Sequence, residues 1–384
     1  MYLEALRLHA FRNYAELHAA FPPGLILLTG PNAAGKTNLL EAVHLLCTGF
    51  SHRGARDVDM AAWGGSHYAV HGMLRSNGQP VDLVVRFDST EGKRVSALGT
   101  TLRRRADLMD YAAAVAFSPD DLRLVKGEPA HRRRYLDRLA VLLDRRHAAD
   151  LAEFRGVLEQ RNQLLRDLRA RRTGRSLAGL FDEPYLALAA RVLARRVAAL
   201  GRALPAAASA LEGLTGGRER LGVLYLEGGD HPHDPQSPGA EAARTQYWLE
   251  RGRAALASRA GDEQERALTL WGPHRDDVAF RIDGRDVRVH ASQGQQRSVV
   301  LALKRAEFQI TAEALGVPPL LLLDDVLSEL DPDRSAALLR FALEADQALV
   351  TAAVDASTDL GPWRGAAAAV YTVAGGRLAG GPPP

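Results

Sequence analysis

Several common ingredients of proteins are scarce in this chain of 384 residues. Cys47 is its one cysteine, which excludes a disulfide within the chain and fits a reducing compartment. No stretch approaches the roughly 20 consecutive apolar residues of a membrane-spanning helix. The first residues, Met1-Tyr2-Leu3-Glu4, lack the basic and then apolar layout of a signal peptide. We therefore expect a cytoplasmic protein with no membrane partner.

Lysine is also rare. Only four of the 49 basic residues are lysines, and Lys36 is one of them. Arginine suits bidentate contacts with phosphate, but a GC-rich codon bias is the simpler explanation of the excess. The net charge of +3 is small, but the pI near 9.1 and the arginine content are informative.

The pattern of apolar residues changes twice along the chain. Strand patterns fill residues 2–30 and 66–102, where Asn77-Gly78 predicts a hairpin turn. A helical period then covers residues 105–266, apart from a loop rich in glycine and proline at about 228–240. These changes indicate at least two kinds of structure in one chain.

Strand patterns resume after the helical region, most clearly in the apolar runs Leu320–Leu323 and 347–354. A chain of this length exceeds the size of most single cores, so we predict two domains. The first is an α/β head with mixed sheets, formed by residues 1–104 and 267–384 together. The second is a helical insertion, residues 105–266.

Two apolar seams indicate a short antiparallel helical hairpin within the insertion, with a basic connection at residues 169–182. The seam residues are Leu151, Phe154, Leu158, Leu165 and Leu168 on one side and Leu186, Ala190, Leu193, Val197, Leu200 and Leu204 on the other. Arg161 interrupts the first seam.

The most specific motif follows the apolar strand at residues 24–29. It reads Gly30, Pro31, Asn32, Ala33, Ala34, Gly35, Lys36, Thr37 and matches a phosphate-binding P-loop. Its glycines let backbone N–H groups approach phosphate oxygens, and the following helix presents its positive N-terminus. Lys36 is expected to reach the β- and γ-phosphates of ATP, and Thr37 to offer its hydroxyl to Mg²⁺.

A second half of such a site follows Leu320–Leu323. In P-loop ATPases the carboxylate that holds Mg²⁺ typically comes at the end of an apolar strand, and Asp324 has this position. Asp325 comes next and is placed to orient or deprotonate the attacking water. Taken alone, this pair could also be a strand that ends in a capped turn.

The segment Ser292-Gln293-Gly294-Gln295-Gln296 looks like the signature loop that caps the nucleotide of a partner subunit in one class of ATPases. With the acidic strand and a D-loop at residues 328–331, it is similar to the heads of the structural-maintenance-of-chromosomes and Rad50 group. Three further segments, residues 10–14, 117–137 and 272–277, narrow the resemblance to the RecF family, in that family's order and over essentially the whole chain.

The resemblance implies an ATP-dependent DNA clamp. RecF-type proteins dimerise with two ATP molecules between their heads and bind double-stranded DNA near single-strand gaps and junctions. With RecR and RecO they promote loading of RecA onto DNA coated by single-strand-binding protein. Slow, DNA-stimulated hydrolysis resets the clamp, so ATP acts as a dimerisation switch.

Carried over by position, the resemblance assigns roles to single residues. Lys36 and Asp325 take the catalytic positions, and Thr37 and Asp324 the Mg²⁺ positions. Ser292 and Gly294 contact the γ-phosphate of the opposite protomer. The remaining expected nucleotide-site residues are Arg12, Asn13, Asn38, Gln295 and Asp331, of which Asp331 links the two sites.

The chain departs from its relatives at two points. Transporter-type ATPases place a histidine after the strand that corresponds to residues 347–354, where this chain has Thr351-Ala352-Ala353. The region of the Gln-loop reads Phe117-Ser118-Pro119, without a glutamine. The sequence therefore leaves the sensor of the γ-phosphate unassigned, and both departures fit slow hydrolysis.

DNA-contacting residues are harder to read. The densest basic clusters are Arg103, Arg104 and Arg105; Arg132, Arg133 and Arg134; Arg145 and Arg146; and Arg169, Arg171, Arg172 and Arg175. Each could be a solvated face, although a clamp needs a positive surface that contacts phosphates rather than bases. His274 and Arg275, beside Asp276 and Asp277, fit a functional site and a structural loop network equally well.

Other functions fit less well. A nucleotide-binding subunit of an ABC transporter would carry its signature much closer to the P-loop. A Rad50-type protein would have long coils and zinc-binding cysteines, and this chain has a short hairpin and one cysteine. Another SMC-like DNA-binding ATPase remains an alternative. A DNA-binding module with a vestigial ATP site is a further one, which ATP turnover would distinguish.

Overall fold

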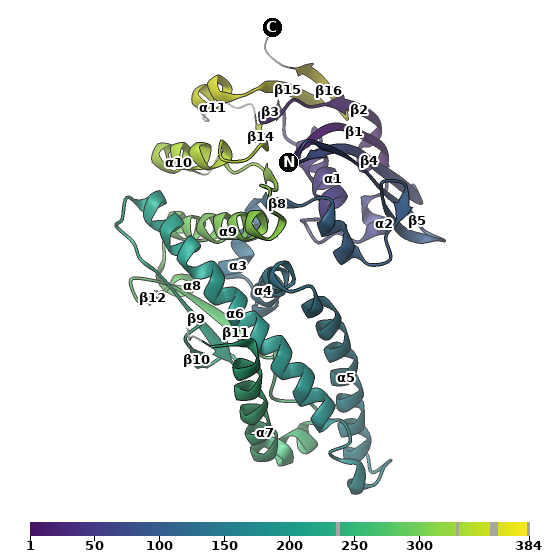
Figure 1. The fold of residues 1–384 in the computed structure, drawn as a ribbon, viewed down its shortest axis with the longest axis vertical. Coiled ribbons are helices and arrows are strands. Elements are labelled where there is room, and N and C mark those ends of the chain that lie inside the picture. The colour runs from purple at the N-terminus through teal and green to yellow at the C-terminus, as the bar shows by residue number, and fades with distance from the viewer. Residues whose placement is uncertain (236–238, 328–329, 354–359, 382–384) are drawn as a thin grey trace. The chain divides into compact units, whose positions relative to one another are not determined.

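The computed structural model describes residues 1–235, 239–327, 330–353 and 360–381 (Figure 1). The chain divides into two compact units. The first is formed by Met1–Asp121, Gly213–Gly217 and Leu301–Pro384, and the second by Leu122–Glu212 and Arg218–Val300.

The elements follow the chain in alternating groups. The strands are β1 (Tyr2–Phe11), β2 (Tyr14–Ala20), β3 (Gly24–Gly30), β4 (His67–Ser76), β5 (Gln79–Asp88), β6 (Gly92–Ala97), β7 (Thr100–Thr101), β8 (Ala114–Phe117), β9 (Leu221–Glu227), β10 (His231–His233), β11 (Asp277–Ile282), β12 (Arg285–Asp286), β13 (Leu320–Leu323), β14 (Gln347–Ala353), β15 (Ala369–Ala374) and β16 (Arg377–Gly381). The α-helices are α1 (Lys36–Thr48), α2 (Asp57–Met60), α3 (Arg123–Lys126), α4 (Pro129–Leu143), α5 (Arg146–Arg169), α6 (Asp182–Thr215), α7 (Glu241–Arg266), α8 (Val287–His290), α9 (Gln293–Leu315), α10 (Pro332–Ala342) and α11 (Gly361–Ala366).

The first unit contains two six-stranded sheets. One has the order β2-β1-β4-β5-β6-β7, and its neighbouring strands are antiparallel. The other has the order β16-β15-β3-β14-β13-β8, and its pairings from β15 to β8 are parallel. The parallel strands read as continuous apolar runs because both of their faces are covered, as in β13, where all four residues are buried. This mixed-sheet head confirms the predicted fold class.

Helix α1 contacts strands of both sheets in the first unit. Its Val43 belongs to one apolar core with Leu8 of β1 and Ile26 of β3. The helix approaches β4 so closely that a Cβ added to Gly72 would lie 2.2 Å from Leu46 Cδ2. The start of α1, which carries the P-loop lysine, is therefore held by packing along the helix.

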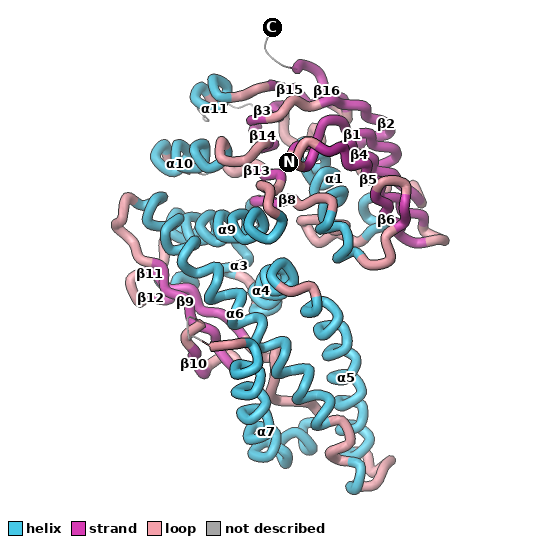
Figure 2. Tube along the Cα trace, in the orientation of Figure 1, coloured by secondary structure: helices cyan, strands magenta, loops and turns pink. Residues whose placement is uncertain are grey.

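The second unit combines long helices with the antiparallel sheet β10-β9-β11-β12 (Figure 2). Helices α5 and α6 form the predicted antiparallel hairpin: Arg161 pairs with Asp182 at 2.9 Å near its tip, and Arg195 pairs with Asp150 further along. The buried seam residue Phe154 packs on Tyr185 with ring centroids 5.5 Å apart.

The unit boundaries differ from the predicted ones in three places, one of which is the short segment Gly213–Gly217 in the first unit. Residues 105–121 lie in the first unit because β8 pairs with β13, and a four-residue strand is too short to show a period. Residues 267–300 lie in the second unit because β11 pairs with β9. The region 105–266 was expected to be helical, but it contributes the strands β8, β9 and β10. In the described part of the chain, no helix is long and apolar enough to cross a membrane.

Candidate nucleotide site

The P-loop connects β3 to α1 through a backbone that only small residues permit. Gly30 has φ +148° and Gly35 has φ +114°, conformations that favour glycine. A Cβ on Gly30 would lie 2.3 Å from the Val373 carbonyl oxygen, and a Cβ on Gly35 would lie 2.4 Å from Asn13 Nδ2. Both glycines are therefore required by the close approach of neighbouring groups.

Lys36, the first residue of α1, is folded over this loop and is only 7% exposed. Its Nζ donates to the Gly30 carbonyl at 2.7 Å and to the Pro31 carbonyl at 2.9 Å. Burial lowers the pKa of the Lys36 ammonium, and the nearby carboxylates of Asp325 and Asp324 partly oppose that shift. A buried cation held mainly by carbonyl dipoles is well suited to pair with an anion.

The acidic motif meets the P-loop helix through a set of short hydrogen bonds. Thr37 Oγ1 donates to Asp324 Oδ1 at 2.9 Å, across 287 positions of sequence. Thr351 Oγ1, from the neighbouring strand β14, donates to the same oxygen at 2.9 Å. The Asp324 N–H donates to the Phe117 carbonyl of β8 at 2.8 Å. The carboxyl ends of three parallel strands thus converge on one carboxylate, as expected at this edge of an α/β sheet.

Asp325 adopts a left-handed backbone with φ +50°. That conformation is uncommon for a residue other than glycine, although Asp and Asn tolerate it better than most. Its N–H donates to Thr351 Oγ1 at 2.8 Å, which fixes the turn after β13. Thr351 therefore holds the carboxylate of Asp324 and the backbone of Asp325.

The donor set fits a magnesium ion that is shared with phosphates. A threonine hydroxyl and one carboxylate, Thr37 and Asp324, are hard oxygen ligands, and Mg²⁺ at such sites takes one or two protein ligands and keeps several waters. Within the described ranges, no three His, Cys, Asp or Glu side chains gather as a metal-binding group.

Arg12, Asn13 and Asn38 surround the P-loop. The guanidinium of Arg12 binds the buried carboxylate of Glu41 in α1 with two hydrogen bonds of 2.8 and 2.9 Å. Asn13 Nδ2 donates to the Ala34 carbonyl at 3.1 Å, and Asn38 Nδ2 donates to Asn13 Oδ1 at 2.8 Å. These contacts brace the loop and its helix, and a direct contact of the three residues with nucleotide stays a prediction.

The signature-like loop lies in the second unit, at the start of α9. Ser292 Oγ accepts from the Gln295 N–H at 3.2 Å, and Gln295 Oε1 accepts from the Ser292 N–H at 2.8 Å, which is a capping box. Gln295 also donates to Glu219 at 3.0 Å. Gly294 is partly buried in the first turn of the helix. This geometry presents the N-terminus of a long helix, a place that favours anions.

The predicted D-loop is only partly described. Asp331 is the N-cap of α10, where its Oδ1 accepts from the Arg334 N–H at 3.0 Å. Ser328 and Glu329 lie outside the described residues. The expected link of Asp331 to a second site stays a prediction.

Two residues near the acidic motif were not identified from the sequence. Thr351 was noticed only as part of a segment without histidine, although a polar residue in an apolar parallel strand could have indicated its role. His52, whose Nε2 lies 4.0 Å from Asp324 Oδ2, follows α1 in a stretch with no recognisable pattern.

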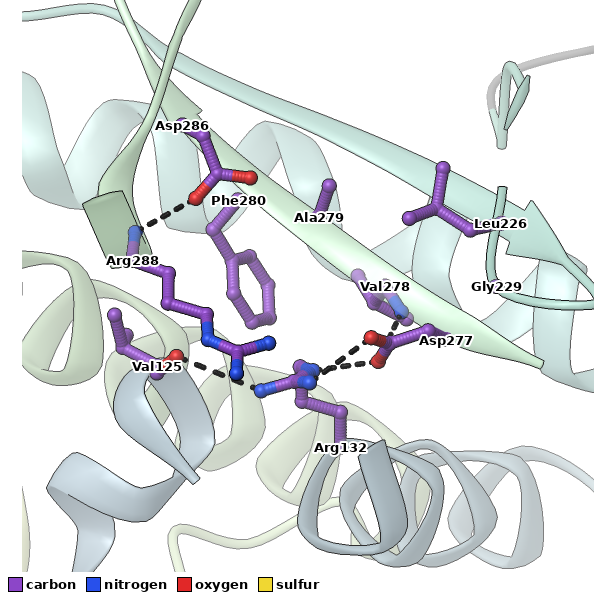
Figure 3. Close-up of a pocket in the computed structure, with 10 residues that line it drawn as sticks. All are labelled: Val125, Arg132, Leu226, Gly229, Asp277, Val278, Ala279, Phe280, Asp286 and Arg288. Carbon is purple, nitrogen blue, oxygen red and sulfur yellow. Dashed lines mark hydrogen bonds and ion pairs between the residues drawn. The ribbon is translucent and has the colours of Figure 1, made fainter. Parts of the chain in front are cut away.

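Some of the basic candidates for DNA contact are structural. Arg132 is buried and forms a bidentate pair with Asp277, with bonds of 2.6 and 2.9 Å, beside a pocket in the second unit (Figure 3). Arg133 is partly buried and donates to the Asp276 carbonyl at 2.7 Å. At the hairpin tip, by contrast, Arg171 and Arg172 are exposed.

The segment that follows Pro273 belongs to a buried network. Asp276 accepts from the Tyr225 hydroxyl at 2.7 Å and from the Gly228 N–H at 2.9 Å, and burial raises its pKa to about 6. His274 lies 3.2 Å from the Thr269 carbonyl, and burial lowers its pKa to about 4. These contacts support the structural reading of the two that the sequence left open.

Comparisons with known proteins agree with this geometry. A family model described as an AAA domain matches residues 5–110. The DNA replication and repair protein RecF of Heliobacterium modesticaldum is 42% identical over 339 residues, 88% of this chain and 88% of that protein.

Solved structures extend the likeness to the whole chain. The structure of the recombination mediator protein RecF with ATP, in the RecFOR pathway, superimposes with a TM-score of 0.84 at 29% identity and covers 99% of this chain and 97% of that one. The Smc head of Pyrococcus furiosus, at a TM-score of 0.54 and 15% identity over 99% and 96% of the two chains, shares the fold. The chain has an ATPase-type fold and belongs to the RecF family of DNA replication and repair proteins.

Proposed function

We propose that this protein is an ATP-dependent DNA-binding recombination mediator. Two copies dimerise around two ATP molecules and bind double-stranded DNA near single-strand gaps and at junctions. With RecR and RecO, the dimer promotes loading of RecA onto DNA coated by single-strand-binding protein. Slow, DNA-stimulated hydrolysis then returns the protein to its starting state. Membership of the RecF family and the likeness to a RecF structure with ATP support this proposal.

One observation carries the ATP part of the proposal. Thr37 at the start of α1 and Asp324 at the end of β13 share a hydrogen bond, and Lys36 lies folded beside them. This arrangement fits a nucleoside triphosphate with Mg²⁺. It combines a cationic side chain, a helix N-terminus and the oxygens of Thr37 and Asp324.

The roles of the residues follow from their chemistry. Lys36 exchanges its two carbonyl contacts for the β- and γ-phosphates, and Thr37 and Asp324 hold Mg²⁺, which neutralises phosphate charge when bound. Asp325, which Thr351 holds in its turn, orients the attacking water as a catalytic base.

The dimer completes each site from the other copy. Ser292, Gly294 and Gln295 present the N-terminus of α9 to the γ-phosphate held by the partner's P-loop, and Asp331 links the two sites. Without a γ-phosphate the signature loop has no anionic ligand, so ADP does not support the dimer. ATP is thereby a switch for assembly.

DNA contacts in this proposal are with phosphates. Exposed arginines such as Arg169, Arg171 and Arg172 at the hairpin tip supply positive charge that does not depend on sequence. The buried Arg132 does not take part, because its guanidinium is paired with Asp277.

Binding to a fluorescent gapped duplex tests the proposal. Affinity should rise with ATP and not with ADP, and salt should weaken it steeply. Lys36→Ala should lose ATP affinity by about 100-fold and lose the ATP effect on DNA, because a charge-assisted contact is removed. Lys93→Ala is a matched control, since Lys93 pairs with Asp57 at 2.7 Å outside the P-loop. Equal DNA affinity with ATP, with ADP and without nucleotide would contradict the proposal.

A further inference from the structure

His52 is a buried histidine whose ring nitrogens make no hydrogen bond within the described part of the chain. Its side chain is 5% exposed, and neither ring nitrogen has a hydrogen-bond partner among the residues that the structure describes. Nε2 faces Asp324 Oδ2 at 4.0 Å, which is longer than a hydrogen bond. A buried polar group in this condition costs stability, so its presence calls for an explanation.

The loop that carries His52 is tied to α1. The Phe50 carbonyl contacts His44 Nδ1 at 2.8 Å, and the Ser51 hydroxyl donates to Glu41. The rings of His44 and His52 pack edge to face with centroids 5.5 Å apart. The imidazole is therefore held in place by contacts other than its own hydrogen bonds.

Three carboxylates from different parts of the chain act electrostatically on the His52 ring. Glu41 is already bound by Arg12 and Ser51, and Asp121 is bound by the Ser118 N–H at 2.8 Å and by Lys304 at 3.3 Å. In Asp324, the third, Oδ1 accepts from Thr37 and Thr351, while Oδ2 faces His52. Burial lowers the pKa of His52, and these carboxylates oppose that shift.

We propose that His52 is a positioning residue of the magnesium–nucleotide site, whose Nε2 holds Asp324 Oδ2, directly or through water, when Mg²⁺ and ATP are bound. This inference rests on the proposed ATP function. It adds a side chain beside Asp324, in a site where the sequence shows neither a Gln-loop glutamine nor a switch histidine. Since groups that orient a metal ligand affect metal affinity, the loop after α1 becomes coupled to the loaded state of the site.

The test is a titration of Mn²⁺ into the full chain with ATP, followed by electron paramagnetic resonance, which reports bound metal without turnover. We expect His52→Ala to weaken Mn²⁺ affinity about 10-fold or more. Glutamine places an amide N–H near the position of Nε2 and should restore affinity, whereas the shorter asparagine should not. ATP affinity in EDTA and the melting temperature should stay near the parental values.

His44→Gln is the control for the loop, because it disturbs the contact with Phe50 and the ring packing but leaves the Nε2 of His52 in place. It should keep the parental Mn²⁺ affinity. Parental affinity in His52→Ala, an equal loss in His44→Gln, or rescue by asparagine as good as by glutamine would overturn the inference. If the parental chain itself bound no ATP with Mn²⁺, the proposed function would fail instead.

Discussion

Buried polar groups at the nucleotide site of the first unit are arranged differently from the Arg196 network of the second unit. In the second unit, Arg196 forms a bidentate pair with Asp137, with bonds of 2.7 and 2.9 Å, and Asp137 also contacts His147 at 2.9 Å. In the first unit, the hydrogen bonds of Lys36 within the described residues go to two backbone carbonyls, and His52 makes none.

The difference separates two uses of a buried charge. A pair such as Arg196 and Asp137 meets the cost of desolvation inside the protein, so its role is to hold elements together. For Lys36 and His52 the contacts inside the protein offset only part of the desolvation cost, as expected of groups that bind or position a ligand. The predictions below test this contrast in order of expected effect.

The largest effect is expected from breaking the Arg196 pair. Arg196→Met leaves the carboxylate of Asp137 buried without its main partner and should lower the free energy of unfolding by about 3–5 kcal/mol. Urea denaturation measures the change. Lys36→Met is the matched comparison and should cost well under half as much, since Lys36 has no hydrogen-bonded carboxylate among the described residues. Equal losses of unfolding free energy in the two variants would contradict the difference between the Arg196 pair and Lys36.

Asp325→Asn should slow DNA-stimulated ATP hydrolysis by about 100- to 1000-fold, because it removes the base for the attacking water. Asparagine tolerates the left-handed backbone at φ +50°, so ATP binding should persist and the ATP-bound dimer should accumulate. Phosphate release and sedimentation measure the two effects. Hydrolysis at the parental rate would show that Asp325 has another role.

Asp276→Asn should change the pH dependence of stability. Burial raises the pKa of Asp276 to about 6 from 3.8, so the folded chain binds more protons than the unfolded chain between those values. Its contribution to stability is therefore present below about pH 4 and is lost as pH rises to about 6. Relative to the parent, the free energy of unfolding of the variant should rise by on the order of 3 kcal/mol between these limits. A difference that does not vary with pH, measured by urea denaturation, would contradict the assignment.

The smallest effect is expected from a substitution of Ser292, which tests how ATP joins the two copies. Ser292→Asp keeps an N-cap for α9 but puts a negative charge where the partner's γ-phosphate should lie. We expect ATP-dependent dimerisation to weaken about 10-fold, with ATP affinity of the monomer unchanged. Ser292→Asn keeps the cap without the charge and should dimerise normally. Equal dimerisation of the two variants would place the γ-phosphate elsewhere.

The local motifs could be predicted from the sequence because each lies within one strand–loop–helix segment. The P-loop at residues 30–37 and the acidic strand before Asp324 needed only a run of residues and their order. The apolar seams of α5 and α6 could be recognised because their helical period repeats over many turns.

The rest depends on pairings that are distant in sequence. Arg132 stands among the basic clusters that could contact DNA because its structural partner Asp277 lies 145 positions away in the sequence. Residues 267–300 belong to the second unit because β11 pairs with β9, and this pairing also joins segments that are far apart in the sequence. The sequence gives no indication of the role of His52, because that role depends on the Asp324 oxygen that the side chain faces.

Sedimentation velocity of the unmodified chain shows whether ATP causes two copies to assemble. It should be run without nucleotide, with ADP, with ATP, and with ATP and duplex DNA. We expect a monomer in the first two conditions and a dimer in the last two, because only ATP offers a γ-phosphate to the opposite signature loop. A dimer of equal mass in every condition, or a monomer throughout, would contradict this expectation.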